Sequence, residues 1–557
     1  MNTSRRSLLK ASALGGSTAL LASCDQATRQ LTQLLGETVP DHLAVPESAE
    51  IDPDFHLLSR AAFGPWPGDV QRVKEMGRDA WIEEQLNPDS IPDNACDLRA
   101  ERFESLYFSA GDAYEFRKPV LRDELTRHAL LRAIYSRRQL FEVMVEFWTD
   151  HLNIDLEKGD CIYLKPSDDR EVIRKHALGN FHDLIRASAT SPAMLVYLDG
   201  KSNKVRKNTN DKPNENYARE LMELHTLGVH GGYTQDDVRE AARCLSGWTF
   251  DVKRVFALNQ GESFFKPDWH DDGEKTVLGQ VIAGRSRARK SVEIVAEDRP
   301  NDHRLAAAAT DSGGARKSVD GRPEDHRLAA AAYDGSKDID DLVNIVCSHP
   351  STAQFIATKL CRRFISYTPP ESIVQRVADE FTKTKGDIKS LLRVILKSDE
   401  FAASRGTLLK RPFKFIVSAL RATAADTSAE KGVLEPLHRM GHGLFQYPTP
   451  DGYPDEELPW MGTLMWRWNF SLALAGGKQP GARVNLTPLI QALRTEKAKE
   501  PDSATWFGHL VGRKPTEKEL AAIALTPPTK KDASPEFAAE SKQTVGLILA
   551  SPAFQRC

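Results

Sequence analysis

The chain has 557 residues, of which 75 are Lys or Arg and 78 are Asp or Glu, so its formal net charge is only -3. A nucleic-acid-binding protein usually carries a basic surplus, and a disordered acidic chain combines low hydrophobicity with high net charge. A chain that is 40% hydrophobic and nearly neutral has neither property. We therefore expect a globular protein that does not bind nucleic acid.

Residues 1–23 have the pattern of an export signal. Arg5 and Arg6 precede an apolar pair, and residues 11–24 contain no charge. This apolar stretch is shorter than the roughly 20 residues that span a bilayer, and the whole pattern resembles the twin-arginine signal. We therefore expect the twin-arginine export machinery to pass the folded chain across the membrane. A chance arginine pair is the alternative.

Cys24 follows Leu21, Ala22 and Ser23, an order that resembles a lipobox. In a lipobox the cysteine is acylated and becomes the mature N-terminus, and two or three acyl chains hold a protein persistently on a membrane. We expect a lipid anchor at Cys24, on the periplasmic side of the cell membrane or elsewhere in the cell envelope. An ordinary cleavage site beside an unmodified cysteine is the alternative. The polar residues 24–50 are predicted to be a flexible tether.

Helical spacing of apolar residues dominates from about Ile51 onward. One stripe of a helix is formed by Leu140, Val143, Met144, Phe147 and Trp148. Strand-like alternation is scarce. The pattern predicts a mainly α, multi-helical fold with two or more helical lobes and long loops, in an N-terminal region over 51–283 and a C-terminal region over 337–557.

Residues 284–336 interrupt this plan with a duplication. The sequence of residues 299–305, followed by four alanines, recurs with small changes over 322–328 with four more. A solenoid needs at least three repeats to bury a core, and these copies hold almost no large apolar residue. We interpret the range as a solvated, low-complexity insertion. The duplication explains the matching His303 and His326 better than a metal site does.

The segment 213–228 is predicted to be an amphipathic helix, with Pro213 in its first turn and Gly228 at its C-terminal end. At 100° per residue, one side collects Glu215, Asn216, Arg219, Glu220, Glu223 and Thr226, broken by Leu227. If this side faces water, its charges form only weak surface pairs. If it faces a cleft, the crowded carboxylates raise one another's pKa, and Arg219 offsets this.

A tight turn follows this helix at Gly231 and Gly232, with His230 at its tip. Thr234, with Asp237 three residues later, is typical of the start of a helix. The two helices are therefore predicted to form a hairpin.

Two further histidines are candidates for the same site. His151 extends the stripe of residues 140–148, and His270 lies beside Asp271 in a polar loop. Acid/base catalysis would use His151, Arg219, Glu220 and Glu223. A divalent metal would be bound by His151, Glu220, His270 and Asp271. No H-E-x-x-H or similar motif specifies either site, and the alternatives are a core histidine at 151 and a solvated turn at 270.

Other catalytic signatures are missing from the chain. It contains no G-x-S-x-G, no P-loop and no G-x-G-x-x-G after a strand. The aromatic loop over 448–454, together with Trp460, Trp466 and Trp468, could form a surface for a sugar or a partner. Such Trp/Pro clusters more often wrap a helical core.

Five motifs together resemble the domain of unknown function 1800 family over roughly residues 51–557. They lie at 147–152, 192–199, 214–221, 233–249 and 270–275. The family is bacterial, often exported and often encoded beside the sulfatase-like domain of unknown function 1501 family. The resemblance implies a sulfatase-like partner but supplies no established activity. Thr149 and His225 stand where the family commonly has His and Phe, and the first change weakens a two-histidine metal site at that motif.

Two hypotheses follow. In the first, the acidic helix and the histidines line a cleft for acid/base or metal-dependent chemistry in the cell envelope. In the second, the protein is a lipid-anchored helical scaffold for a sulfatase-like partner, and its polar motifs are buried structural networks. The further polar candidates in these motifs are Asp199, Asn214, Glu215 and Asn216.

Overall fold

The computed structural model describes residues 27–28, 30–206, 209–251, 261–284, 334–494, 500–524 and 538–557. Arg5, Arg6 and Cys24 of the predicted export signal lie outside the described residues, as does most of the duplicated insertion. Within these ranges, no helix combines the length and the apolar character that crossing a membrane requires.

Helices make up most of the described chain, and the predicted mainly α, multi-helical fold is confirmed. The helices of the first half are α3 (Pro53–Ala61), α4 (Asp69–Met76), α5 (Arg78–Gln85), α6 (Asn94–Ala100), α7 (Lys118–Tyr135), α8 (Gln139–His151), α9 (Cys161–Asp168), α10 (Phe181–Ala189), α11 (Pro192–Tyr197), α12 (Asn216–Glu220) and α13 (Gln235–Cys244). The short strands form antiparallel pairs, namely β1 (Trp248–Phe250) with β2 (Ser263–Phe265), β3 (Lys275–Val277) with β4 (Gln280–Ile282), and β5 (Asp426–Thr427) with β6 (Ala482–Arg483).

The second half continues with further helices. They are α16 (Asp338–Cys347), α17 (Pro350–Phe364), α18 (Glu371–Thr384), α19 (Ile388–Leu396), α20 (Asp399–Ala403), α21 (Pro412–Ala422), α22 (Lys431–Arg439), α23 (Leu458–Met461), α24 (Leu464–Ala475), α25 (Thr487–Leu493), α26 (Ser503–Val511), α27 (Glu517–Ala524), α28 (Ala539–Ala550) and α29 (Pro552–Gln555).

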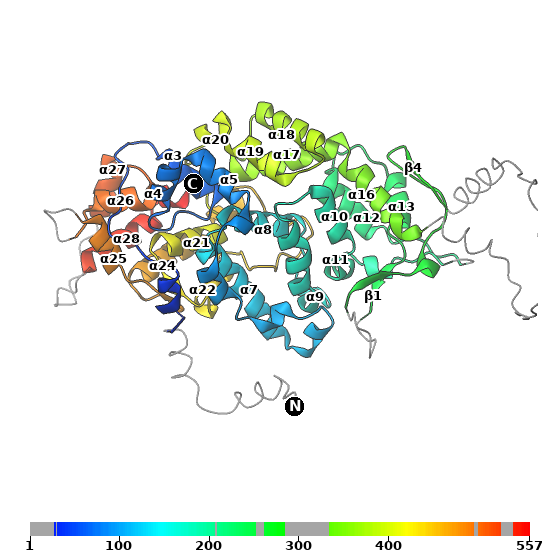
Figure 1. Cartoon of the computed structure of the whole chain (residues 1–557), viewed down its shortest axis with the longest axis horizontal. Helices are drawn as coiled ribbons and strands as arrows, with labels where there is room; N and C mark the ends of the chain where they lie inside the picture. The colour runs from blue at the N-terminus through cyan, green and yellow to red at the C-terminus, as the bar shows by residue number, and fades with distance from the viewer. Residues whose placement is uncertain are drawn as a thin grey trace, which may run out of the picture.

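Most buried apolar side chains form one continuous core that extends from Leu43 to Phe554, and Leu409, Tyr453 and Trp460 form a small separate cluster. The two predicted regions therefore share a core across their boundary. In Figure 1, α7, α8 and α21 occupy the middle of the molecule, and α17 to α20 lie above them in this view. Within this arrangement α21 packs against α7, and α17 packs against α18.

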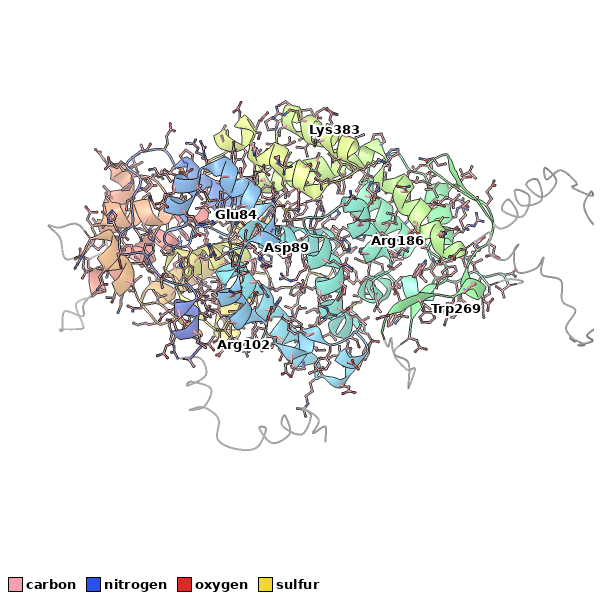
Figure 2. All side chains as sticks on the ribbon, in the orientation of Figure 1. Glu84, Asp89, Arg102, Arg186, Trp269 and Lys383 are labelled. Atoms are coloured by element: carbon pink, nitrogen blue, oxygen red, sulfur yellow. The ribbon has the colours of Figure 1, made fainter. Side chains whose placement is uncertain are left out.

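The two ends of the molecule differ in which parts of the chain they bring together (Figure 1). At one end the segment before α3 contacts the C-terminal helices, because Asp52 N donates to Gly512 O at 2.8 Å. At the other end α16 packs against α10 and α13. Arg186 and Trp269, both labelled in Figure 2, mark this second end. The Arg186 guanidinium there lies 5.3 Å from the ring centre of Trp248.

Part of the predicted tether contacts the rest of the chain in the structure. Arg99 is buried, and its Nη2 lies 2.6 Å from Glu37 Oε2 and 3.0 Å from Thr32 Oγ1. Leu43 belongs to the core, and its backbone N donates to Ala492 O at 3.0 Å. These residues of the stretch therefore have partners far away in the sequence, and the flexible tether over 24–50 stays a prediction.

Helices α8 and α17 contact each other through charged side chains. Arg363 Nη2 of α17 lies 2.5 Å from Glu146 Oε2 of α8. Pro350 is the first residue of α17, where its missing N–H costs no hydrogen bond. The buried face of α17 then follows the helical period, with Ile356, Leu360 and Phe364 in the core.

Candidate functional site

His151, the last residue of α8, lies buried between α8, α17 and the segment after α12. Its Nε2 is 3.0 Å from the backbone oxygen of His225, and its Nδ1 is 3.2 Å from Lys359 Nζ. A carbonyl oxygen only accepts hydrogen bonds, so Nε2 carries the proton and Nδ1 accepts from the lysine. The two contacts therefore fix both the orientation and the tautomer of the ring.

The surroundings disfavour positive charge on both partners. Burial holds the pKa of His151 well below its usual value, and Lys359 and His225 lower it further. Burial also lowers the pKa of Lys359, although Asp455 and Asp150 partly offset this. A lysine amine with a lowered pKa is a recognised type of proton acceptor or nucleophile.

His225 adds a second buried imidazole to the site. Its ring centre lies 6.2 Å from that of His151, and burial lowers its pKa to about 3. Neither of its ring nitrogens has a hydrogen-bond partner within the described ranges. An unsatisfied buried polar group carries a desolvation cost of about 1–3 kcal/mol, so this ring is held there by the surrounding structure.

The helix predicted over 213–228 is present in part and changes its winding. It begins at Asn216 rather than at Pro213, because α12 spans Asn216–Glu220, and Leu221–Thr226 continue as the π-helical segment η6. In a π-helix the hydrogen bonds join residues five apart. Thr226 Oγ1 donates at 2.7 Å to the carbonyl five residues before it. Thr226 is therefore buried, where the α-helical period predicts a polar, outward position.

The predicted polar side of this helix is half-buried. Burial raises the pKa of Glu220, Glu223 and Asp451 raise it further, and Arg219 lowers it. Arg219 itself lies between two partners, with Nη2 3.2 Å from Glu215 Oε2 and 3.1 Å from the Gln235 side chain. Glu220 therefore retains its proton to a higher pH than an acid in water does.

The segment over 447–455, which contains the predicted aromatic loop over 448–454, packs against the C-terminal end of α8. Asn153 Nδ2 donates to two carbonyls of this segment, at 2.8 and 2.9 Å. Gly452 has a φ of +76° and lies so close to the backbone of Asp150 that a Cβ would overlap the carbonyl oxygen. Only glycine fits both conditions, and the contact places the loop residue Asp451 beside the site.

Asp451 connects the two titrating groups of the site electrostatically. Its carboxylate raises the pKa of Lys359, against the effect of burial. The same carboxylate raises the pKa of Glu220. A lysine from α17 and a glutamate from α12 therefore respond to the same carboxylate.

An ion network lies behind the lysine. Arg411 Nη2 is 2.6 Å from Glu146 Oε1 and 2.7 Å from Asp150 Oδ2. Burial alone would raise the pKa of Glu146, but Arg363 and Arg411 lower it. Burial and the neighbouring Glu146 raise the pKa of Asp150. Two carboxylates that share one guanidinium thus differ in proton affinity, as expected for close acidic pairs.

His270 and Asp271 belong to a different group of side chains. His270 Nδ1 donates to Ser246 O at 2.8 Å, and Nε2 lies 3.1 Å from Asp338 Oδ2. Asp271 Oδ2 is 2.8 Å from Arg243 Nε. Burial raises the pKa of Asp271, and the contact with Arg243 helps to lower it to about 2. This group joins α13 and α16, and its partners differ from those of the α8 histidine.

The structure gives each predicted metal-binding histidine two other partners. Both ring nitrogens of His151 and of His270 have hydrogen-bond partners. The described ranges hold no group of three or more His, Cys, Asp or Glu side chains placed to bind a metal ion. The metal site of His151, Glu220, His270 and Asp271 stays a prediction.

The remaining polar candidates form hydrogen bonds and a turn in the segment before α12. Asn216 Nδ2 donates to Leu198 O at 3.0 Å, and Asn216 N donates to the Asn214 side chain at 3.0 Å. Asp199 has a φ of +60° and closes the turn on the other side. These contacts position α12 and show why the motif needs short polar side chains.

Sequence patterns did not point to Lys359, which lies on α17. Lys359 and Asp451 reach the site from segments 208 and 300 residues after His151, so no local spacing connects them. The helix also carries Arg362 and Arg363, so a basic residue in it was no specific signal either.

Fold and site together define a mainly α protein in which a half-buried lysine contacts a buried histidine beside a group of carboxylates. Over residues 56–556 the chain matches the family described as Protein of unknown function (DUF1800), and it belongs to that family. The resemblance of the five motifs is thereby confirmed. No curated protein and no solved structure gives a significant match.

Proposed function

We propose that this protein is an exported, lipid-anchored enzyme of the cell envelope that performs acid/base chemistry with Lys359. The observation that carries the proposal is the 3.2 Å contact between Lys359 Nζ and His151 Nδ1. Burial lowers the pKa of this lysine, so more of its amine is uncharged near neutral pH than for a lysine in water. An uncharged amine is able to accept a proton from a substrate.

Glu220 supplies the complementary acid in this proposal. Burial raises its pKa, which favours the protonated form that donates. A base and an acid work at the same pH when their surroundings move their pKa values in this way. His151 positions the lysine amine, and Glu223 and Arg219 adjust the proton affinity of Glu220.

The location in the cell envelope rests on the N-terminal sequence. Arg5 and Arg6 support export by the twin-arginine machinery, and Cys24 supports a lipid anchor on the periplasmic side. Release of the protein from membranes by Cys24→Ser would support the anchor, and unchanged membrane association would contradict it.

The catalytic proposal is tested with substrate fractions of the cell envelope. Wild-type, Lys359→Met and Lys383→Met proteins are purified as full chains after export and incubated with these fractions, and products are identified by mass spectrometry. Lys383 is a matched control, because its side chain is 75% exposed on α18 and labelled in Figure 2. General acid/base groups contribute about 100-fold or more to rates.

We expect product from wild type and from Lys383→Met. For Lys359→Met we expect a rate that is lower by about 100-fold. An unchanged rate in Lys359→Met, or no product from any fraction with wild type, would contradict the proposal.

Elemental analysis addresses the metal prediction separately. A stoichiometric divalent metal that is lost in both Glu220→Ala and His270→Ala would support it, and a metal that survives both changes would exclude these ligands.

A scaffold for a sulfatase-like partner of the domain of unknown function 1501 family is the second candidate. The paired state of His270 with Asp338 and of Asp271 with Arg243 favours it, because these motif residues join helices to one another. Co-purification with the partner from the cell envelope, together with full partner binding by Lys359→Met, would support the scaffold. Absence of the partner from the purified protein would count against it.

A further inference from the structure

The helical segment over 30–34 and the turn that follows it expose three leucines. Leu31, Leu34 and Leu35 are 50%, 83% and 48% exposed, and Leu34 is the most exposed large apolar side chain in the part of the chain that the structure describes. Leu35 N donates to Leu31 O at 3.0 Å, so the helical winding includes all three leucines. Residues three and four positions apart lie on one face of a helix. The three side chains therefore form an apolar face, here called the leucine face.

Thr32 attaches this segment to the body of the protein. Thr32 is fully buried, and its Oγ1 accepts from Arg99 Nη2 of α6 at 3.0 Å. The same guanidinium lies 2.6 Å from Glu37 Oε2, just after the segment. Buried charge-assisted hydrogen bonds are among the stronger ones in proteins. The leucine face therefore has a defined orientation relative to α6.

The predicted lipid at Cys24 limits the distance between the leucine face and a membrane. Leu31 follows Cys24 by seven residues, and an extended chain advances at most about 3.6 Å per residue. Acyl chains on Cys24 would therefore keep Leu31 within about 25 Å of the bilayer surface. A compact chain of this length is roughly 60 Å across. The side of the molecule that carries the leucine face is thus the side that the lipid holds toward the bilayer.

The composition of the segment suits a membrane interface. Residues 30–36 contain no charged side chain, so their insertion brings no charge into the lipid. Leu98 of α6 is 40% exposed, so the helix that holds the segment contributes a further apolar side chain to the surface. An apolar helical face beside exposed polar residues, here Gln30 and Gln33, is typical of segments that lie in the plane of a membrane.

We propose that the leucine face inserts into the interface of the bilayer that holds the Cys24 lipid. The inference rests on the lipid anchor of the proposed function and adds a second contact to it. Binding strength at an interface scales with the apolar area that is buried, so three leucines alone bind weakly and reversibly. Their effect is on orientation. Because Arg99 fixes the segment to α6, insertion of the leucines determines which side of the protein faces the lipid.

A fluorophore at residue 34 tests this inference on the full acylated chain. Leu34→Cys is labelled with a thiol-reactive dye that emits at shorter wavelength in apolar surroundings, and the cysteines that the structure describes are buried. The protein is bound to vesicles of phosphatidylethanolamine and phosphatidylglycerol. The same label on the Cys24→Ser chain in buffer gives the reference emission. Val281→Cys is a matched control, because Val281 is 49% exposed and lies on β4, at the other end of the molecule (Figure 1).

We expect the label at residue 34 to emit at shorter wavelength on vesicles than in buffer, and the label at residue 281 to show no shift. Leu31→Asp together with Leu35→Asp should return the emission of the vesicle-bound chain to its value in buffer. Thermal unfolding verifies that each variant folds.

An unshifted label at residue 34 on a vesicle-bound chain would overturn this inference and leave the lipid anchor intact. A label that is already shifted in buffer would show that the protein itself or a second copy covers the leucine face, and would also overturn it. A chain that carries no acyl group at Cys24 and does not bind vesicles would overturn both the inference and the anchor.

Discussion

Lys359 Nζ donates a hydrogen bond to His151 Nδ1 across 208 positions of sequence, at a distance of 3.2 Å. On the other side of the ring, Nε2 donates to the backbone oxygen of His225. The imidazole is therefore held from both sides before any substrate binds. A side chain that is fixed by packing and hydrogen bonds in this way is suited to proton transfer, which requires a defined geometry.

His225→Phe should raise the free energy of unfolding by about 1–3 kcal/mol, because the two ring nitrogens of His225, which have no partner among the described residues, are buried at a cost. Its backbone oxygen still accepts from His151 in this variant. Chemical denaturation at pH 7 measures the change. His151→Phe is the comparison, and it should lower stability because it leaves the His225 carbonyl without its donor. Destabilisation by His225→Phe would contradict this account of the site.

Stability should fall as the pH decreases below about 6.5, which is the ordinary pKa of histidine. Burial lowers the pKa of His56, His225 and His442 to about 3 in the folded chain. Since the unfolded chain takes up these protons first, the stabilisation is present above pH 6.5 and is lost as the pH falls toward 3.

Each such histidine contributes up to about 1.4 kcal/mol per pH unit in that window. Denaturation curves at pH 7, 6 and 5 measure the slope, and His225→Phe should make it shallower by one histidine's share. An identical slope in wild type and His225→Phe would show that this ring does not remain neutral.

Gly452→Ala should destabilise the chain by about 1–3 kcal/mol more than Gly441→Ala. The two glycines have φ angles of +76° and +75°, so the strain from a positive φ is matched. A Cβ at Gly452 overlaps the backbone of Asp150, whereas a Cβ at Gly441 meets no atom within 4 Å. Thermal unfolding compares the two variants, and equal effects would mean that the loop does not depend on this contact.

Local patterns in the sequence predicted the parts of the fold that depend on neighbours. The stripe that ends in Trp148 and His151 forms α8, and Thr234 with Asp237 forms the predicted start of α13. The apolar side of the helix after Glu215 is buried, with Tyr217 and His225 in the interior. In each case the signal lies within one or two helical turns.

The rest depends on contacts that no local pattern encodes. The change to π-helical winding at Leu221–Thr226 moves Thr226 inward, and a fixed angle of 100° per residue does not predict it. Arg99 contacts Glu37 of the predicted tether from 62 positions away. The association of His151 with Lys359 rather than with His270 likewise follows only from the packing of α8 on α17.

The pH dependence of Lys359 acylation tests the central claim most directly. A short pulse of an amine-reactive acylating reagent is applied to the folded full chain between pH 6 and 11, a range chosen to bracket the ordinary lysine pKa of about 10.4, and modification at Lys359 is quantified by mass spectrometry. The account predicts a half-maximal rate at a pH clearly below that ordinary value, because burial lowers the pKa of this amine. A half-maximal rate at or above the ordinary value would contradict the proposal that Lys359 accepts a proton near neutral pH.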